Sequence, residues 1–232
     1  VSVTQSFKKN LVRRGIDGSK IDVVTNGVDL KRFSHRVKNE NLVNQLDLKD
    51  CFVAGYIGTH GMAHSLETLL HAVSKLRDHP CGKKIRLVLL GDGAQKQFLK
   101  DEANQLNLTN VIFIDTVSKE KVSDYWSILD TSIIHLKKTE LFKTVIPSKL
   151  FECMGMGIPV LHGVEGESAN IVEKTNCGVL FEPENVDQLI EKLLYLQSEP
   201  KSLESLSRNA LVSAKQYDRA HLAIQMLDCL IL

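Results

Sequence analysis

The chain has 232 residues, of which 43% are hydrophobic and 25% are charged. This composition is ordinary for a water-soluble globular protein with a sizeable buried core, so we expect one main domain with smaller additions. The 29 Lys and Arg residues nearly balance the 28 Asp and Glu residues, and a formal net charge of +1 argues against a surface that binds nucleic acid or an anionic membrane.

The first 50 residues do not share the pattern of the rest of the chain. The sequence begins with Val1 instead of Met and leads into an expected helix that ends near Gly15, which indicates a fragment of a longer protein. An apolar run at 21–24 and a turn signal at 26–29 follow. From there to Asp50 the chain is polar, and we predict a loop or linker.

From residue 52 onward, short apolar runs alternate with longer amphipathic stretches, which is the pattern of repeated βαβ units. The predicted strands are 52–56, 85–90, 111–114, 131–135, 160–162 and 178–181. The predicted helices are 65–76, 94–106, 120–128, 148–156, 168–174 and 186–198. We therefore expect an α/β fold, a Rossmann-like parallel sheet of about six strands with helices on both faces. In such sheets, ligands bind beyond the carboxyl ends of the strands.

The last segment, 200–232, is predicted to be a pair of helices. Its apolar end at 222–232 lacks the basic face that is typical of a membrane-surface helix. We expect this end to pack on a partner domain or in an oligomer.

The five cysteines are scattered and lack the spacing of a zinc site, which favours a reduced, cytoplasmic compartment. No signal-like segment opens the sequence, and no run approaches the roughly 18 apolar residues that span a bilayer. We expect a cytoplasmic protein. A peripheral contact of a longer form with the inner face of the plasma membrane is left open.

The most informative stretch runs from 145 to 160. Pro147 and Ser148 suit a helix N-terminus, whose free N–H groups and positive dipole end bind a diphosphate. Lys149 adds a positive charge, and Glu152, one turn further, is placed to accept hydrogen bonds from a ribose diol. The alternative is that Glu152 is a solvated helix residue, as most glutamates are.

Five motifs resemble, in order and spacing, the C-terminal domain of family-four retaining glycosyltransferases. They are 26–29 with Phe33, 55–61, 89–93, 147–160, and 178–181 followed by 185–187. Each motif alone is weak, whereas the five together are specific to the family. The resemblance implies the GT-B fold of two facing Rossmann-like domains, with this chain as the half that binds the nucleotide sugar.

In that family, two glutamates separated by seven residues flank the donor site, and the second binds the ribose. Glu152 matches the second glutamate, whereas the position of the first falls on Thr144, so the chain departs from the common pattern. Some members that make bacterial surface polysaccharides, including transferases for deoxyamino sugars, have a similar block without the first glutamate.

The glycine loop, residues 58–64, departs from the family pattern as well. Members often carry an Arg just after the first glycine and a Lys six positions after it, both on the diphosphate, whereas this chain has Thr59 and His64. Backbone N–H groups and the helix start must then contribute more. The expected phosphate contacts are Gly58, Thr59, His60, Gly61 and Ser148, with Lys149 as the cation.

His60 and His64 have two interpretations. Either ring could donate a hydrogen bond to the phosphate or donor sugar and carry part of a positive charge at neutral pH. The alternative is that both rings face solvent. The loop at 91–93, after the second strand, is interpreted first as a structural turn, although the resemblance places it near the donor pocket.

The segment 114–117 lies where the family reads the nucleobase through backbone groups, which adds Thr116 and Val117 to the expected donor contacts. No carboxylate cluster accompanies the histidines, so we expect no metal site, and the resemblance implies catalysis without a divalent ion or another cofactor. No Ser/His/Asp set or phosphate-binding G-x-x-x-x-G-K-[ST] loop is visible, which argues against a hydrolase or NTPase. We assign no catalytic residue in this chain.

The resemblance predicts that the intact protein transfers a sugar from a nucleotide diphosphate sugar to a lipid-linked or glycan acceptor with retention. We expect a UDP-linked donor, with an N-acetyl or deoxyamino sugar as one option. Residues 1–50 would be the end of the acceptor-domain side and the interdomain linker, 51–199 the donor-binding domain, and 200–232 helices on the partner domain. The acceptor half and its histidine would precede Val1, so this chain alone should bind nucleotide without catalysing transfer.

Two other functions remain open from the sequence. One is a nonhydrolysing UDP-sugar epimerase of similar architecture, which would need acid/base groups near the anomeric carbon. The other is a non-catalytic binding module, since several charged donor contacts of the family are missing. UDP affinity separates the module from the enzymes, and incubation of the full-length protein with UDP-sugars separates the two enzymes.

Overall fold

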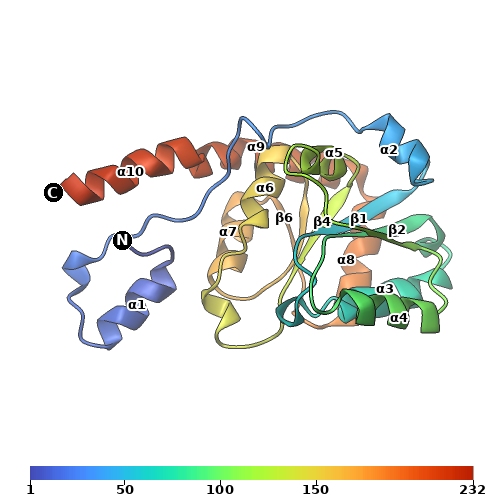
Figure 1. Ribbon diagram of the computed structural model, residues 1–232, viewed down its shortest axis with the longest axis horizontal. Coiled ribbons are helices and arrows are strands. Elements are labelled where there is room, and N and C mark those ends of the chain that lie inside the picture. Colours follow the sequence, from blue (N-terminus) through green and yellow to red (C-terminus); the bar gives the residue numbers. More distant parts are fainter. Residues whose placement is uncertain (232) are drawn as a thin grey trace.

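One parallel sheet forms the centre of the molecule (Figure 1). The computed structural model describes residues 1–231, and within them six strands pair in the order β3-β2-β1-β4-β5-β6. The strands are β1 (Phe52–Ile57), β2 (Ile85–Leu90), β3 (Val111–Ile114), β4 (Thr131–His135), β5 (Val160–Gly163) and β6 (Gly178–Leu180). All six predicted strands are confirmed, and their ends differ from the prediction by at most one residue.

Helices cover both faces of this sheet (Figure 1). The helices of residues 1–231 are α1 (Gln5–Arg13), α2 (Glu40–Gln45), α3 (Glu67–Arg77), α4 (Lys96–Gln105), α5 (Val122–Ser127), α6 (Lys149–Met156), α7 (Glu167–Thr175), α8 (Val186–Ser198), α9 (Pro200–Ala214) and α10 (Arg219–Ile231), of which α1 lies beside the sheet domain. The six helices predicted between and after the strands are confirmed within two residues at each end, as are the N-terminal helix and the C-terminal pair. The predicted Rossmann-like α/β fold is therefore confirmed.

The stretch predicted to be a loop or linker contains one helix, α2. Asn39 caps this helix, because its side-chain oxygen accepts the Leu42 N–H at 3.2 Å. Leu42 and Val43 then pack against the core, and Leu48 is buried. The loop prediction was wrong here because the helix has only six residues, too few to show helical periodicity in a polar run.

Two apolar cores lie on opposite faces of the sheet, because successive side chains of a strand point to opposite sides. On β2, Val88 and Leu90 enter the first core, whereas Leu87 and Leu89 enter the second. The first core is closed by α5, α6 and α9, and the second by α3, α4 and α8. Burial of both faces explains why the central strands are continuous apolar runs.

The strand order reverses next to β1, which pairs with β2 on one side and β4 on the other. In open α/β sheets, ligands bind at the carboxyl edge where the order reverses. The chain leaves β1 at Gly58 and β4 at Leu136. The fold therefore predicts a ligand site around these two loops.

The loop after β2 supports the loop after β1. The His60 N–H donates to the Asp92 carbonyl at 2.8 Å. Gly91 and Gly93 have φ values of +144° and +153°, which side chains rarely tolerate, and a Cβ on Gly91 would lie 1.9 Å from the carbonyl oxygen of Gly58. The structural interpretation of 91–93 is therefore supported, since this turn holds the glycine loop in place.

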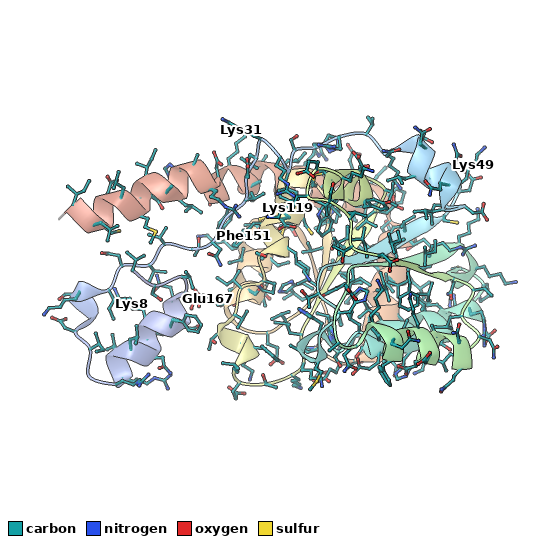
Figure 2. The ribbon with its side chains drawn as sticks, viewed as in Figure 1. Lys8, Lys31, Lys49, Lys119, Phe151 and Glu167 are labelled. Atoms are coloured by element: carbon teal, nitrogen blue, oxygen red, sulfur yellow. The ribbon has the colours of Figure 1, made fainter. Side chains whose placement is uncertain are left out.

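Residues 1–24 form a small unit beside the sheet domain (Figure 1), and a short parallel β-bridge joins its two ends. Glu167, the first residue of α7, connects this unit to the domain, and Figure 2 shows it next to α1. Its two carboxylate oxygens accept the Gln5 N–H at 2.7 Å and the Ser6 N–H at 2.9 Å. The carboxylate thus satisfies the free N–H groups of α1.

Parts of both flanking segments pack into the sheet domain. Val28 and Phe33 belong to the first core. Along α9, the Ser207 hydroxyl donates to the Gly157 carbonyl at 2.6 Å, so α9 packs on α6 of this chain. For α10, packing on a partner domain stays a prediction, as do the predicted domain boundaries at residues 50 and 199.

The helix α10 leaves the domain on the same side as α1 (Figure 1). Its exposed apolar side chains are Ile224, Met226, Leu227, Leu230 and Ile231. Among the helices of residues 1–231, none is both long enough and apolar enough to cross a membrane.

Replacing Gly91 with Ala should lower the free energy of unfolding by about 2–4 kcal/mol, because a non-glycine residue in such a conformation costs about 1–3 kcal/mol and the new Cβ also clashes. Urea denaturation measures this loss. Gly15→Ala is the matched control, since Gly15 has a φ of +90° but nothing within 4 Å of a Cβ. An equal loss in both variants would show that packing of the two loops does not constrain Gly91.

Candidate donor-binding site

The glycine loop after β1 and the start of α6 lie in direct contact. Gly58 has a φ of +147°, and a Cβ at this position would lie 2.6 Å from the Lys149 ammonium. Only glycine leaves room for this approach. The structure therefore brings these two elements together. The N–H groups of Gly58 and His60 already donate to the carbonyls of Leu90 and Asp92, so within residues 1–231 only Thr59 and Gly61 of residues 58–61 keep free backbone N–H groups, and the expected N–H contacts from Gly58 and His60 are wrong.

The N-terminus of α6 is open. Ser148 has helical φ and ψ of −60° and −30°, and its hydroxyl makes no capping hydrogen bond. Within residues 1–231, no backbone carbonyl accepts the N–H of Ser148 or Lys149. Pro147 precedes these N–H groups and has none of its own to satisfy. The positive end of the helix thus presents free donors, and Ser148 is exposed.

Lys149 is partly buried and has no acidic partner. Its ammonium lies over the Tyr56 ring, 3.9 Å from the ring centroid. In the described part of the chain, no carboxylate lies within ion-pairing distance of it. Burial lowers the pKa of Lys149 to about 8, although Cys153 and Glu152 act in the opposite direction. A partly buried cation without a counter-ion is suited to an anionic ligand.

Glu152 is partly buried one turn into α6, so it is not the solvated helix residue of the alternative interpretation. Burial raises the pKa of its carboxyl group, whereas Lys149, Arg32 and Arg219 lower it. The two arginines come from the segment before β1 and from α10. Glu152 therefore lies where the flanking segments meet the sheet domain.

His60 and His64 do not face solvent, so the solvent alternative is wrong for both. His60 is fully buried, and neither of its ring nitrogens has a hydrogen-bond partner. His64 is partly buried, and its Nδ1 lies 3.3 Å from the His135 carbonyl oxygen.

The other interpretation, a partial positive charge on these rings at neutral pH, is not supported either, while a hydrogen bond from a ring to a ligand stays a prediction. Burial is the main cause that lowers the pKa of His60 to about 4 and that of His64 to about 4. Nearby ammonium groups act in the same direction, Lys96 on His60 and Lys149 on His64. Both rings are therefore neutral at pH 7.

The other loop residues differ in exposure. The Thr59 side chain is exposed, while its carbonyl accepts the Tyr56 hydroxyl at 2.7 Å. Gly61 is partly buried and precedes a short 3₁₀ turn. The Thr144 hydroxyl donates to the Leu141 carbonyl at 2.7 Å. Position 144 thus carries a hydroxyl group where the family has a carboxylate.

Thr144 lines a cavity of about 890 Å³ between α1, α7 and the 3₁₀ turn that precedes α6. Glu140, Lys143 and Asn170 share this lining. Lys143 pairs with Glu140 at 2.6 Å. Most of the residues that line this cavity have polar or charged side chains.

The two residues predicted near the nucleobase point to different places. Thr116 is exposed and lines a cavity of about 450 Å³ together with Lys96, Lys100 and Asp115. Val117 packs against the first core instead. Recognition of the nucleobase through backbone groups of this segment stays a prediction.

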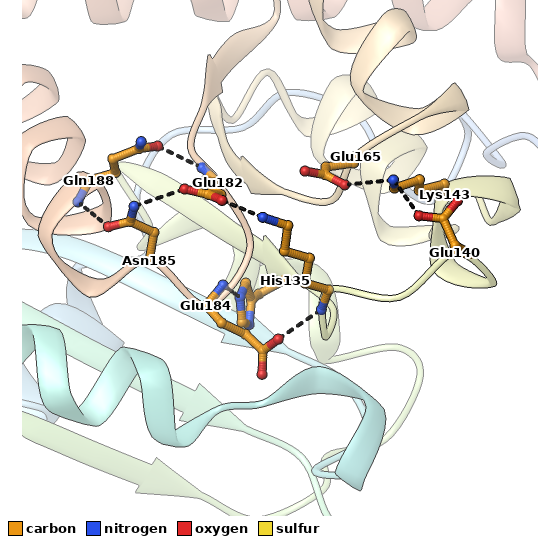
Figure 3. A network of polar contacts seen from close by, with 9 residues as sticks. His135, Glu140, Lys143, Glu165, Glu182, Glu184, Asn185 and Gln188 are labelled. Atoms are coloured by element: carbon orange, nitrogen blue, oxygen red, sulfur yellow. Dashed lines mark hydrogen bonds and ion pairs between the residues drawn. The ribbon is translucent and has the colours of Figure 1, made fainter.

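Sequence reasoning missed His135, which joins the glycine loop to the loop before α8. Figure 3 shows its contact with Glu184. Its Nδ1 lies 2.8 Å from the His64 carbonyl, and its Nε2 accepts the Glu184 N–H at 2.8 Å, so Nδ1 carries the proton. The Glu184 carboxylate accepts the Lys138 N–H at 2.8 Å. The sequence did contain a signal for this role. His135 is the last residue of the predicted strand that became β4, which pairs with β1 where the strand order reverses.

Tyr56 was missed as well, although it stands two residues before Gly58. Because Tyr56 lies in an apolar strand, its ring was interpreted only as part of the hydrophobic core. Within residues 1–231, no three His, Cys, Asp or Glu side chains gather in a way that could hold a metal ion.

The free energy of unfolding should fall as the pH is lowered from about 6.5 to about 4. The folded pKa values of His60 and His64 lie below 6.5, so the unfolded chain binds more protons in this window. His60→Leu should flatten the dependence by up to about 1.4 kcal/mol per pH unit, which is one proton. At pH 7 this variant should be at least as stable as the wild type, because it removes two unpartnered nitrogens.

Urea denaturation at a series of pH values measures this effect. His221→Leu changes an exposed histidine of α10 and serves as the control. Parallel pH dependences in wild type and His60→Leu would contradict a neutral, buried His60.

Proteins of known name resemble this chain over most of its length. The putative colanic acid biosynthesis glycosyl transferase WcaI of Escherichia coli (strain K12) is 26% identical over 195 residues, which cover 82% of this chain and 47% of WcaI. The alpha-monoglucosyldiacylglycerol synthase of Acholeplasma laidlawii is 23% identical over 221 residues, 92% of this chain and 53% of the synthase. The chain spans about half the length of the curated relatives it matches.

A solved structure shares the fold. HepE of Anabaena in complex with UDP and glucose superposes with a TM-score of 0.84 at 19% identity, covering 99% of this chain and 61% of HepE. The family model described as glycosyl transferases group 1 matches residues 38–212. The chain therefore belongs to this family and has the Rossmann-like fold of the C-terminal half of a GT-B glycosyltransferase.

Proposed function

We propose that this chain is the donor-binding half of a retaining glycosyltransferase that uses a UDP-sugar. The observation that carries the proposal is the Lys149 ammonium, which is partly buried, unpaired and located between the glycine loop and the open end of α6. A diphosphate supplies the negative charge that this environment lacks.

The relatives support the class of donor and of product. HepE has been solved with UDP and with UDP-glucose, and WcaI is named for colanic acid biosynthesis. We propose that this protein likewise takes a UDP-sugar and acts in the assembly of a surface polysaccharide, on a lipid-linked or glycan acceptor. With Thr144 at the first glutamate position, hydroxyl and backbone groups are left to recognise the sugar.

Catalysis would depend on stabilising the departing UDP. Negative charge develops on its β-phosphate as the sugar leaves, and the free N–H groups of Ser148 and Lys149 with the ammonium are aimed at such a charge. Removal of one such donor costs roughly 3–4 kcal/mol in well-studied enzymes. The role proposed for Glu152 is to accept hydrogen bonds from the ribose diol.

The acceptor half and its histidine are proposed to lie in the part of a longer protein that this chain does not include. This chain would then bind UDP without transferring sugar. A cytoplasmic location stays a prediction.

Lys149→Met should weaken UDP binding about tenfold to a hundredfold, because a hydrogen bond to a charged group contributes about 1.5–3 kcal/mol. Isothermal titration calorimetry with UDP at pH 7 and low salt measures the affinity. Lys143→Met is the matched control, since this lysine lies six residues earlier and already pairs with Glu140. Equal affinities of wild type and Lys149→Met would refute the proposed phosphate site.

Glu152→Ala should weaken UDP binding by about 1.5–3 kcal/mol, the contribution of a charged hydrogen bond. The nucleotide 2′-deoxy-UDP identifies the cause, because it lacks one hydroxyl of the diol. Wild type should prefer UDP over 2′-deoxy-UDP, and Glu152→Ala should bind the two equally. A preference that persists in Glu152→Ala would show that another group binds the ribose.

A further inference from the structure

The buried Tyr56 side chain, at the end of β1, contacts both phosphate-binding elements of the proposed site. Its hydroxyl donates to the Thr59 carbonyl at 2.7 Å. Its ring lies under the Lys149 ammonium, 3.9 Å from the centroid. The rings of His60 and His64 are tilted toward it, with centroid distances of 6.0 and 5.4 Å.

We propose that Tyr56 is a positioning residue of the donor site, because its ring holds the Lys149 ammonium and its hydroxyl holds the glycine loop. One rigid side chain would then fix the separation between the cation and the loop N–H groups that remain free for a nucleoside diphosphate, those of Thr59 and Gly61. This inference rests on the proposed function and concerns the same site.

The ring is the favourable partner that the ammonium has in this structure. The titratable groups that face Lys149 are Tyr56 from β1, His60 and His64 from the glycine loop, and Glu152 and Cys153 from its own helix. Both histidines are neutral at pH 7, since each has a pKa of about 4. Neither the Glu152 carboxylate nor the Cys153 thiol forms an ion pair with the Lys149 ammonium, whereas a ring face attracts a cation at this distance.

The hydroxyl fixes the loop in a comparable way. Tyr56 is fully buried, so its O–H needs an acceptor inside the protein, and the Thr59 carbonyl is that acceptor. The Gly58 N–H is held from the other side by the Leu90 carbonyl at 2.9 Å. These two hydrogen bonds orient the Ile57–Gly58 and Thr59–His60 peptide groups, which flank the Gly58–Thr59 peptide, before any ligand arrives.

A bound diphosphate favours the charged form of Lys149 and so raises its pKa above the value of about 8 in the free protein. UDP affinity should therefore fall as the pH rises above about 8, because the free lysine then loses its proton. The diphosphate of UDP is fully ionised there, since the second phosphate pKa is about 6. The midpoint of this fall reports the pKa of Lys149 in the free protein.

The experiment compares Tyr56→Phe and Tyr56→Leu by measuring the UDP dissociation constant from about pH 7 to about pH 9, below the pH at which the uracil ring loses its proton. Tyr56→Phe keeps the ring and loses the hydrogen bond to Thr59, so affinity should fall about threefold to tenfold with an unchanged midpoint. Tyr56→Leu also loses the ring, so affinity should fall a further threefold to thirtyfold, about the contribution of a cation–π contact. Its midpoint should move to lower pH.

Phe151→Leu is the matched control, because it removes a buried aromatic ring from α6 on the side of Tyr217. It should lower stability and leave the midpoint unchanged. In a Lys149→Met background, Tyr56→Leu and Tyr56→Phe should bind UDP equally, since no ammonium is left for the ring to hold.

The outcomes separate the two proposals. If the wild type does not bind UDP, the proposed function fails. If it binds UDP and Tyr56→Leu keeps the wild-type midpoint, or Tyr56→Phe keeps the wild-type affinity, the positioning role of Tyr56 is overturned and the proposed function stands. If Tyr56→Leu does not fold, the affinity of Tyr56→Phe still decides the role of the hydroxyl.

Discussion

The approach of the Lys149 ammonium to Gly58 and Tyr56 is the contact on which the rest of the site depends. This contact can form because Gly58, the residue after β1, has no side chain and because α6 begins opposite this loop. The turn at Gly91 supports the same loop from behind, at a distance that excludes a Cβ. Three segments far apart in the sequence thus meet at one partly buried positive charge.

This positive charge adds to the effect of burial on its neighbours. Lys149 lowers the pKa of His64, and Lys96 lowers that of His60, in addition to the larger effect of burial. The histidines therefore act as neutral packing groups around Tyr56. His135 extends this packing by binding the His64 carbonyl and the Glu184 N–H, so the loop before α8 is tied to the glycine loop.

The sheet was predictable from the sequence because buried parallel strands are continuous apolar runs, as 85–90 and 131–135 are. The motifs likewise indicated that Gly58 and Ser148 would lie near each other. Side-chain burial was not predictable, since His60 is covered by a turn about thirty residues later in the chain. The proposed role of Tyr56 was not predictable either, because an aromatic residue in an apolar strand is usually part of the core.

The departures from the family pattern are linked by the cost of burying charge. A lysine at position 64 would place a second ammonium beside Lys149, in a site whose burial already lowers the pKa of the first to about 8. With neutral His64 and Thr59, one cation and the helix N–H groups are left to balance a diphosphate. The start of α6 is then the proposed principal phosphate anchor. Its strength depends on the charge of Lys149, which Cys153 and Glu152 favour against burial and to which the ring of Tyr56 adds a cation–π contact.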